Sequence, residues 1–84
     1  MKFENEIAVV TGGSTGIGNA TCLNLKQEGA VVYNLDINDI HTAGVNFIKC
    51  DVRDYNAVQN AIKYIFNQEG KIDLLFANAG VHIS

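Results

Sequence analysis

Residues 11–18 read Thr-Gly-Gly-Ser-Thr-Gly-Ile-Gly and are the most informative stretch of this 84-residue chain. They follow the apolar run 7–10 and lead into a segment that is helix-like as far as Glu28. A strand that turns sharply into a helix leaves the first backbone N–H groups of the helix without intrahelical partners. Those donors, together with the positive end of the helix dipole, favour a phosphate-type anion. The stretch is therefore predicted to be a nucleotide-binding turn.

The glycines of this stretch have a particular spacing. Gly12, Gly16 and Gly18 fit the pattern G-x-x-x-G-x-G. No window of the chain fits the commoner dinucleotide pattern G-x-G-x-x-G, or the Walker pattern G-x-x-x-x-G-K-[ST]. Glycines allow a tight turn, close approach to an anion and close packing of helix on strand. A glycine-rich turn without a ligand is the alternative, and the strand, helix and acid around it argue against that alternative.

The length of 84 residues allows at most one small domain, and the composition is that of a globular protein. Apolar residues make up 48% of the chain, proline is absent, the net charge is −3 and the six basic residues do not cluster. This excludes disorder and a nucleic-acid partner, and no apolar run is long enough to cross a membrane. Cys22 and Cys50 lack the spacing of a metal or redox site. We expect no metal, and two small buried thiols in a cytoplasmic protein.

Strand and helix patterns alternate along the chain, which predicts an α/β fold with a parallel sheet. Strands are expected at residues 6–11, 31–36, 46–50 and 72–77, helices at about 16–28 and 55–69, and a loop at 37–45. Gly29 and Gly70 should end the helices, and Asp54 should cap the second one. The residues expected to face the sheet are Ile17, Ala20, Leu23 or Leu25 in the first helix and Val58, Ala61, Ile62, Ile65 and Phe66 in the second.

The order of the strands follows from the right-handed crossovers of such folds. If strands two and three build outward from the first and the fourth returns to its other side, the order is 3-2-1-4. This is a partial, Rossmann-like doubly wound sheet, in which ligands bind at the carboxyl ends of the strands, between strands one and four. Residues 11–18 and the segment Asn78-Ala79-Gly80 should lie on the two sides of that crevice.

Asp36 ends the second strand and bears on the choice of nucleotide. A carboxylate there can accept hydrogen bonds from both hydroxyls of an adenosine ribose, and its charge would repel a 2′-phosphate. Neither Thr15 nor Ile37, where an NADP site would place a basic residue, is basic. The pattern therefore favours NAD. A solvated acid at a strand end is the alternative.

Two further strand ends are candidates for contacts with the nucleotide. Asp51 and Val52 follow the third strand and could frame adenine, although Asp51 could equally be a turn residue. After the fourth strand, Gly80 would allow close approach of the backbone, and the Asn78 amide could hold loops together. A turn without a ligand explains residues 78–80 as well on spacing alone.

In this order and at these spacings, the motifs resemble the classical short-chain dehydrogenase/reductase family over essentially the whole chain. The resemblance implies roles for twelve residues. Gly12, Gly16 and Gly18 would shape the pyrophosphate loop, Ile17 would offer a backbone N–H, Ser14 and Thr15 would approach the adenosine side, Asp36 would bind the adenine ribose, Asp51 and Val52 would flank adenine, and Asn78, Ala79 and Gly80 would line the nicotinamide-side ribose. Ala77 stands where members of the family often have an Asn, which removes one polar contact.

The catalytic groups that the resemblance implies are absent from these residues. The family uses a Ser, a Tyr-x-x-x-Lys pair and an Asn, all beyond its fourth strand. Four residues after Tyr33, Tyr55 and Tyr64 stand Ile37, Gln59 and Gln68, and the only serines are Ser14 and Ser84. We therefore expect no catalytic residue here, and no turnover by these 84 residues alone.

Two hypotheses for function follow. In the first, the chain is the N-terminal, cofactor-binding half of an NAD-dependent oxidoreductase that moves hydride between nicotinamide and a small alcohol or carbonyl substrate. In the second, it is a non-catalytic module that binds a nucleotide or oligomerises. Because the expected fourth strand is apolar and leaves one edge open, it invites association with another chain, which is compatible with a homo-oligomer.

Overall fold

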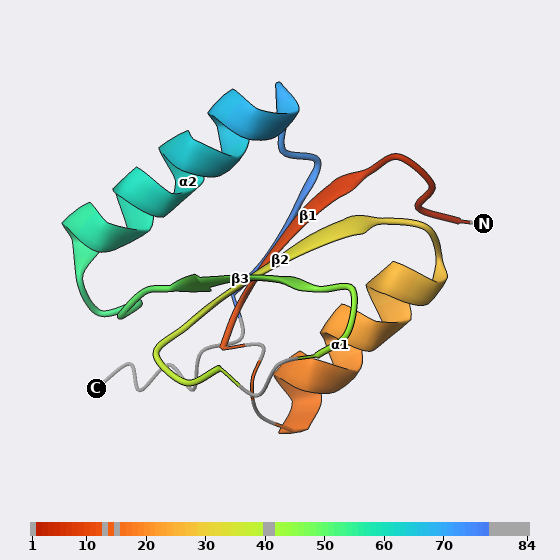
Figure 1. Ribbon diagram of the computed structural model, residues 1–84, viewed down its shortest axis with the longest axis horizontal. Coiled ribbons are helices and arrows are strands. Elements are labelled where there is room, and N and C mark those ends of the chain that lie inside the picture. Colours follow the sequence, from red (N-terminus) through yellow and green to blue (C-terminus); the bar gives the residue numbers. More distant parts are fainter. Residues whose placement is uncertain (1, 13, 15, 40–41, 78–84) are drawn as a thin grey trace.

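The computed structural model describes residues 2–12, 14, 16–39 and 42–77. Its elements in order are β1 (Ile7–Thr11), α1 (Gly16–Gln27), β2 (Val31–Asp36), β3 (Asn46–Lys49), α2 (Tyr55–Glu69) and β4 (Leu74–Ala77). All strand pairs are parallel and the order in the sheet is β3-β2-β1-β4 (Figure 1). The predicted α/β class, the partial Rossmann-like sheet and the strand order are confirmed.

The central strand, β1, is buried on both faces. All five of its residues are buried, as predicted for an apolar run in a parallel sheet. Ile7 and Val9 belong to the core that α2 covers, whereas Ala8 and Val10 belong to the core that α1 covers. The two helices therefore lie on opposite faces of the sheet (Figure 1), which is the three-layer arrangement of a doubly wound fold.

Helix α1 packs on the sheet through a face of small residues. Its buried residues are Gly18, Cys22 and Leu25, which follow one another at helical spacing. The prediction of Leu23 or Leu25 is confirmed by Leu25, which is buried while Leu23 is exposed, but the prediction is wrong for Ile17 and Ala20, which are exposed. The prediction favoured large apolar side chains, whereas close approach of a helix to strands is easiest through Gly18 and Cys22. The helix ends as expected near Gly29, whose φ is 93° and whose N–H donates to the Lys26 carbonyl at 3.0 Å.

Helix α2 has the predicted bounds and caps. The carboxylate of Asp54 accepts from the Ala57 N–H at 3.2 Å, and Gly70, with φ 81°, donates to the Phe66 carbonyl at 2.7 Å. The residues that face the sheet as predicted are Ala61 and Ile65, which are buried, and Val58 and Ile62, which are partly buried. The prediction is wrong for Phe66, which is 53% exposed. Phe66 lies one residue, about 100° of helix rotation, beyond Ile65.

The connection between β2 and β3 is short and lies against α1. Residues 37–39 and 42–45 form neither helix nor strand, as predicted. The side chain of Lys26 occupies the space that a Cβ at Gly44 would need, and Val45 packs on the α1-side core. The hydroxyl of Thr42 donates to the side-chain oxygen of Asn19 at 2.9 Å. The connection is too short to contain a crossover helix, and these contacts hold it on the surface of α1.

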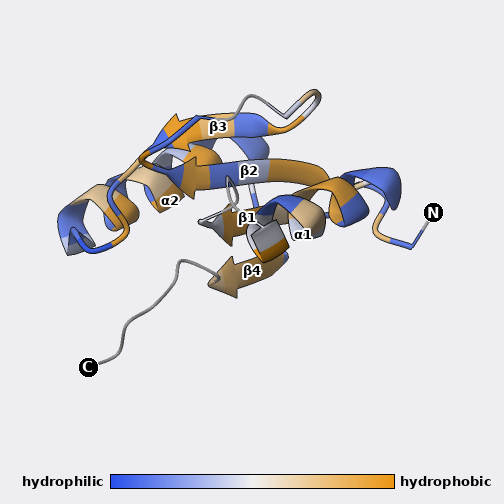
Figure 2. Cartoon of the chain, turned by 90° about the horizontal axis from the view of Figure 1, so that it is seen from below, coloured by the Kyte–Doolittle hydropathy of each residue, from blue (hydrophilic) through white to orange (hydrophobic). Residues whose placement is uncertain are grey.

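The buried thiols and the outer strand also match expectation. Cys22 and Cys50 are buried and free, and burial raises the pKa of each. Strand β4 is the outermost strand and is apolar (Figure 2), with Leu75 62% exposed. Within the described part of the chain, no helix is long and apolar enough to span a bilayer.

Tyr33 links the sheet to the end of α2. Its hydroxyl donates to the Glu69 carboxylate (Oε2) at 2.5 Å. Burial, reinforced by the hydrogen bond to Glu69 and its charge, raises the pKa of Tyr33 to about 12. The neutral phenol is therefore the form that this link requires.

Replacing Ile65 with alanine should destabilise the fold strongly. Ile65 is fully buried between α2 and the sheet, so Ile65→Ala should lower the free energy of unfolding by about 2–5 kcal/mol. Phe66→Ala is the matched control on the same turn of α2, and its effect should stay within about 1 kcal/mol because Phe66 is half exposed. Urea unfolding followed by circular dichroism measures both, and equal losses would contradict the assigned face of α2.

Stability should fall between about pH 10 and about pH 12 because of Tyr33. A phenol in the unfolded chain loses its proton near its ordinary pKa of about 10, while folded Tyr33 keeps its proton up to about 12, so the folded state binds more protons in this window. The free energy of unfolding must then decrease as pH rises. Tyr33→Phe should flatten this slope, and Tyr55→Phe, at an exposed position, should not. An unchanged slope in Tyr33→Phe would rule the link out.

Candidate nucleotide-binding site

The carboxyl end of β1 lies between the ends of its two neighbours. Thr11 is in register with Leu35 of β2 and with Ala77 of β4. The N–H of Gly12 continues the β2 ladder, donating to the Leu35 carbonyl at 2.9 Å, and the Thr11 hydroxyl donates to the Phe76 carbonyl at 3.5 Å. The glycine stretch therefore leaves the sheet at the point where the chain order reverses, which is where doubly wound folds bind their ligands.

The three glycines of the stretch differ in what they contribute. Gly12 has φ 68° and Gly16 has φ 24°, a backbone region that residues with a Cβ rarely adopt. A Cβ on Gly16 would touch nothing, so its requirement is conformational rather than steric. Gly18 is buried and brings α1 close to the sheet. Turn, helix start and helix packing thus each depend on one glycine.

The N-terminus of α1 lies at the same end of the sheet as the carboxyl end of β1, and its own first turn carries no negative charge. The helix begins at Gly16, and its first turn contains no acidic residue. Ile17, in that turn, is 76% exposed. The first N–H groups of the helix have no partner within the helix, and together with the positive end of the helix dipole they favour an anion. This is the arrangement that binds phosphate groups at helix N-termini.

Asp36 lies next to the glycine stretch, as the sequence predicts for a ribose ligand. Its Oδ2 accepts from the Ser14 N–H at 3.2 Å. Its Oδ1 accepts from the N–H groups of Ile37 at 2.6 Å and Asn38 at 3.2 Å. A carboxylate offers about four acceptor positions, and three are used by backbone donors of the described residues. A ribose at the predicted position would therefore share this carboxylate with backbone donors.

Asn34 is a polar residue of this region that the sequence reasoning missed. It is 6% exposed on β2, and its side-chain amide (Nδ2) donates to the Ser14 hydroxyl oxygen at 3.1 Å. Ser14 is itself only 2% exposed, and its hydroxyl donates to the Asn38 carbonyl. An Asn inside an otherwise apolar strand was the available signal, because a buried amide must find a hydrogen-bond partner.

Asp51 lies beside the end of β2 but is bound to Arg53. The strand ends are adjacent because the Cys50 N–H donates to the Asp36 carbonyl at 2.9 Å. The Arg53 guanidinium contacts both oxygens of Asp51, at 3.0 and 2.9 Å, and the Arg53 N–H donates at 2.9 Å. These bonds lower the pKa of Asp51 to about 2. Asp51 thus shapes a turn, and the contacts of Asp51 and of half-buried Val52 with adenine stay predictions.

Four predicted site residues cannot be placed. Thr15, Asn78, Ala79 and Gly80 lie outside the described residues, so their roles stay predictions. Among the residues that are described, no three His, Cys, Asp or Glu side chains are grouped so that they could hold a metal ion.

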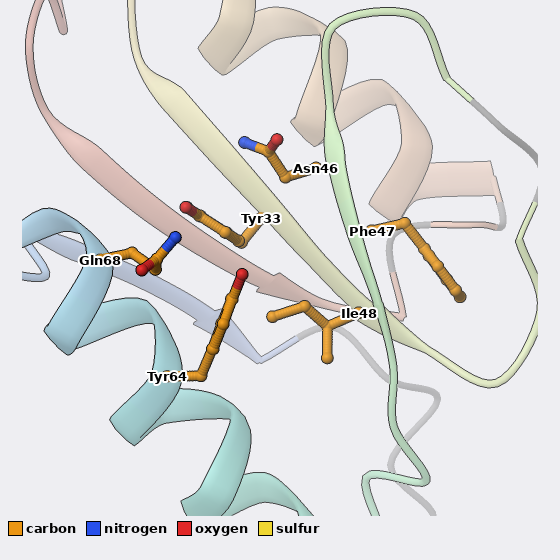
Figure 3. Close-up of a pocket in the computed structure, with 6 residues that line it drawn as sticks. All are labelled: Tyr33, Asn46, Phe47, Ile48, Tyr64 and Gln68. Carbon is orange, nitrogen blue, oxygen red and sulfur yellow. The ribbon is translucent and has the colours of Figure 1, made fainter.

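A hollow in the described part of the structure lies between α2 and strands β2 and β3. It has a volume of about 480 Å³ and is lined by Tyr33, Asn46, Phe47, Ile48, Tyr64 and Gln68. Tyr64 and Gln68 come from α2, and the other residues come from β2 and β3 (Figure 3). None of these is a predicted nucleotide-binding residue. The candidate site is therefore the region at the carboxyl ends of the strands.

Comparison with known proteins gives a consistent result. A sequence model of the family described as short chain dehydrogenase matches residues 6–84. Secoisolariciresinol dehydrogenase of Forsythia intermedia is 35% identical over 95% of this chain, and short-chain dehydrogenase reductase 5 of Arabidopsis thaliana is 33% identical over 96% of it. The chain covers 32% and 35% of those two proteins, so it spans about a third of the length of the curated relatives that it matches.

A solved structure supports the fold. Aldohexose dehydrogenase of Thermoplasma acidophilum, in ligand-free form, superposes with a TM-score of 0.90 at 37% sequence identity. The superposition covers 94% of this chain and 31% of that protein.

Proposed function

The chain belongs to the short-chain dehydrogenase/reductase family, and from this membership we propose that it supplies the NAD-binding part of an oxidoreductase. The reaction is hydride transfer between the nicotinamide and a small alcohol or carbonyl substrate. The family consists of oxidoreductases that in general bind a nicotinamide cofactor. Because the chain covers about a third of its relatives, the activity and substrate of the whole protein are parts of this proposal.

One observation carries the proposal: the hydrogen bond between the Ser14 N–H and the Asp36 carboxylate, at 3.2 Å. It joins the glycine stretch, which suits a diphosphate, to an acid that suits a ribose. A dinucleotide needs both groups side by side, because its adenosine ribose is bonded directly to its diphosphate. A turn without a ligand gives no reason for this pairing.

Each residue then has a role in holding the cofactor, whose nicotinamide supplies the hydride chemistry when bound. The diphosphate is held at the start of α1, the adenosine at the ends of β2 and β3, and the nicotinamide ribose after β4. The proposed ligands are Gly12, Gly16, Ile17 and Gly18 for the diphosphate, Ser14, Thr15 and Asp36 for the adenosine ribose, Asp51 and Val52 for adenine, and Asn78, Ala79 and Gly80 for the nicotinamide ribose.

NAD is proposed rather than NADP on electrostatic grounds. A 2′-phosphate would lie against the Asp36 carboxylate, and like charges at hydrogen-bond distance repel strongly. Arg53, a cation near the ends of β2 and β3, is already bonded to Asp51 on both of its oxygens. A 2′-phosphate would therefore have to compete with Asp51 for that cation.

We assign no catalytic residue to this chain. Its sequence contains no Tyr-x-x-x-Lys pair, so proton transfer to and from the substrate is assigned to residues other than these 84. A cytoplasmic location is proposed because both cysteines are free thiols.

A non-catalytic, oligomerising module is the second candidate, and the outer strand favours it. β4 presents Leu75 and Phe76 to solvent at an open edge of the sheet. Such an edge pairs readily with another strand, so a second copy of the chain is the partner that this candidate predicts. A homo-oligomer is compatible with the enzymatic proposal as well.

Calorimetric titration with NAD and NADP tests the role of Asp36. The wild-type chain should bind NAD at least about tenfold more tightly than NADP, a difference of about 1.4 kcal/mol. Asp36→Asn should remove most of that preference, because the amide no longer repels the 2′-phosphate. Glu4→Gln removes the same charge at an exposed position and should leave the preference unchanged. Equal binding of both cofactors by the wild type would overturn the NAD assignment.

A further inference from the structure

Asn34 is a buried amide to which neither the family motif nor the roles proposed above give any function. It is two residues before Asp36 on β2, and side chains two apart in a strand point to the same face of a sheet. We propose that Asn34 is a positioning residue, which orients Asp36 through Ser14 and so sets the preference for NAD over NADP. This inference rests on the proposed function.

The Ser14 hydroxyl links Asn34 to the loop after β2 through two hydrogen bonds. A hydroxyl has one proton to donate and lone pairs to accept with. The Ser14 hydroxyl donates its hydrogen bond to the Asn38 carbonyl and accepts one from the Asn34 side-chain amide at 3.1 Å. The donor from Asn34 and the acceptor on Asn38 together leave the hydroxyl one orientation, so Asn34 determines where the Ser14 side chain lies.

Ser14 in turn helps to set the plane of the Asp36 carboxylate, because the Ile37 N–H holds Oδ1 at 2.6 Å and the Ser14 N–H contacts the other oxygen, Oδ2. The Ser14 N–H donates to Oδ2 of Asp36 at 3.2 Å, and the Asn38 N–H donates to Oδ1 at 3.2 Å. The carbonyl of the same Asn38 accepts from the Ser14 hydroxyl. Ser14 therefore contacts the acid on one side and the loop that holds the acid on the other. A shift of Ser14 would rotate the Asp36 carboxylate. That carboxylate is the group that would contact the ribose hydroxyls of NAD or the 2′-phosphate of NADP, so its orientation affects the choice between them.

The polarity of the pair is better explained by positioning than by stability. Asn34 and Ser14 are both buried, and taking an amide and a hydroxyl from water costs free energy that their hydrogen bonds mainly offset. An apolar pair of similar size would stabilise a strand position beside Val32 and Leu35 at least as well. What the polar pair adds is a fixed direction at Asp36.

The test compares NAD and NADP binding by the full chain and three variants. Asn34→Ala and Ser14→Ala should each weaken NAD binding about fivefold and leave NADP binding within about twofold of the wild type. The ratio of the dissociation constant of NADP to that of NAD therefore falls. The double variant should lower the ratio no further than Ser14→Ala alone, because both residues act through one bond. Asn46→Ala is the matched control, since it removes an amide that donates to the Val32 carbonyl on β2 at 3.2 Å; its ratio should equal that of the wild type.

The outcomes separate the inference from the proposed function. If Asn34 only stabilises the fold, both affinities fall in proportion and the ratio stays constant, which overturns the inference alone. If the wild type binds neither cofactor, the proposed function fails. Asn34→Val provides a variant suited to a strand should Asn34→Ala not fold; it must lower the ratio equally while its urea midpoint stays near that of the wild type, and an unchanged ratio contradicts the inference.

Discussion

The burial of β1 on both faces is the constraint on which the rest of this structure depends. Alternate side chains of the strand contribute to two separate cores, so the strand needs a helix on each side and a strand at each edge. α1 and α2 supply the helices, and β2 and β4 supply the neighbours. Because the chain leaves β1 on one side and returns on the other, the carboxyl end of β1 lies where the strand order reverses, the place at which doubly wound folds bind ligands. The position of the site follows from the core.

Much of this fold could be predicted from the sequence because each element carries a local signal. Apolar runs gave the strands, Gly29, Gly70 and Asp54 marked helix ends, and the order of strands followed from the handedness of crossovers. The faces of the helices were harder. Ile17 and Leu23 are large and apolar but exposed, because α1 approaches the sheet through its small residues. Periodicity gives the spacing of a face, whereas the partner strand selects which face is used.

The candidate site shows the same division between local signal and tertiary context. The glycine stretch and Asp36 could be found by motif. In the structure the Ser14 N–H of that stretch donates a hydrogen bond to the Asp36 carboxylate. Asn34 could not be found that way, since its importance arises from meeting Ser14, which is distant in sequence and adjacent only after β1 and β2 pair. The Arg53 contact with Asp51 is local, between residues two apart, but it depends on the conformation of the turn after β3, which the sequence pattern does not define.

The three backbone donors already bound to Asp36 change what that acid can contribute to a complex. Under the proposed function, the two ribose hydroxyls would share this carboxylate with the backbone donors, so hydrogen bonds to Asp36 would add little net affinity. The repulsion between the Asp36 carboxylate and the 2′-phosphate of NADP would not be reduced by these backbone hydrogen bonds to the same extent. Under the proposed function, Asp36 would therefore select between cofactors more than it would bind them, and the backbone amides at the start of α1 would supply most of the affinity for a dinucleotide.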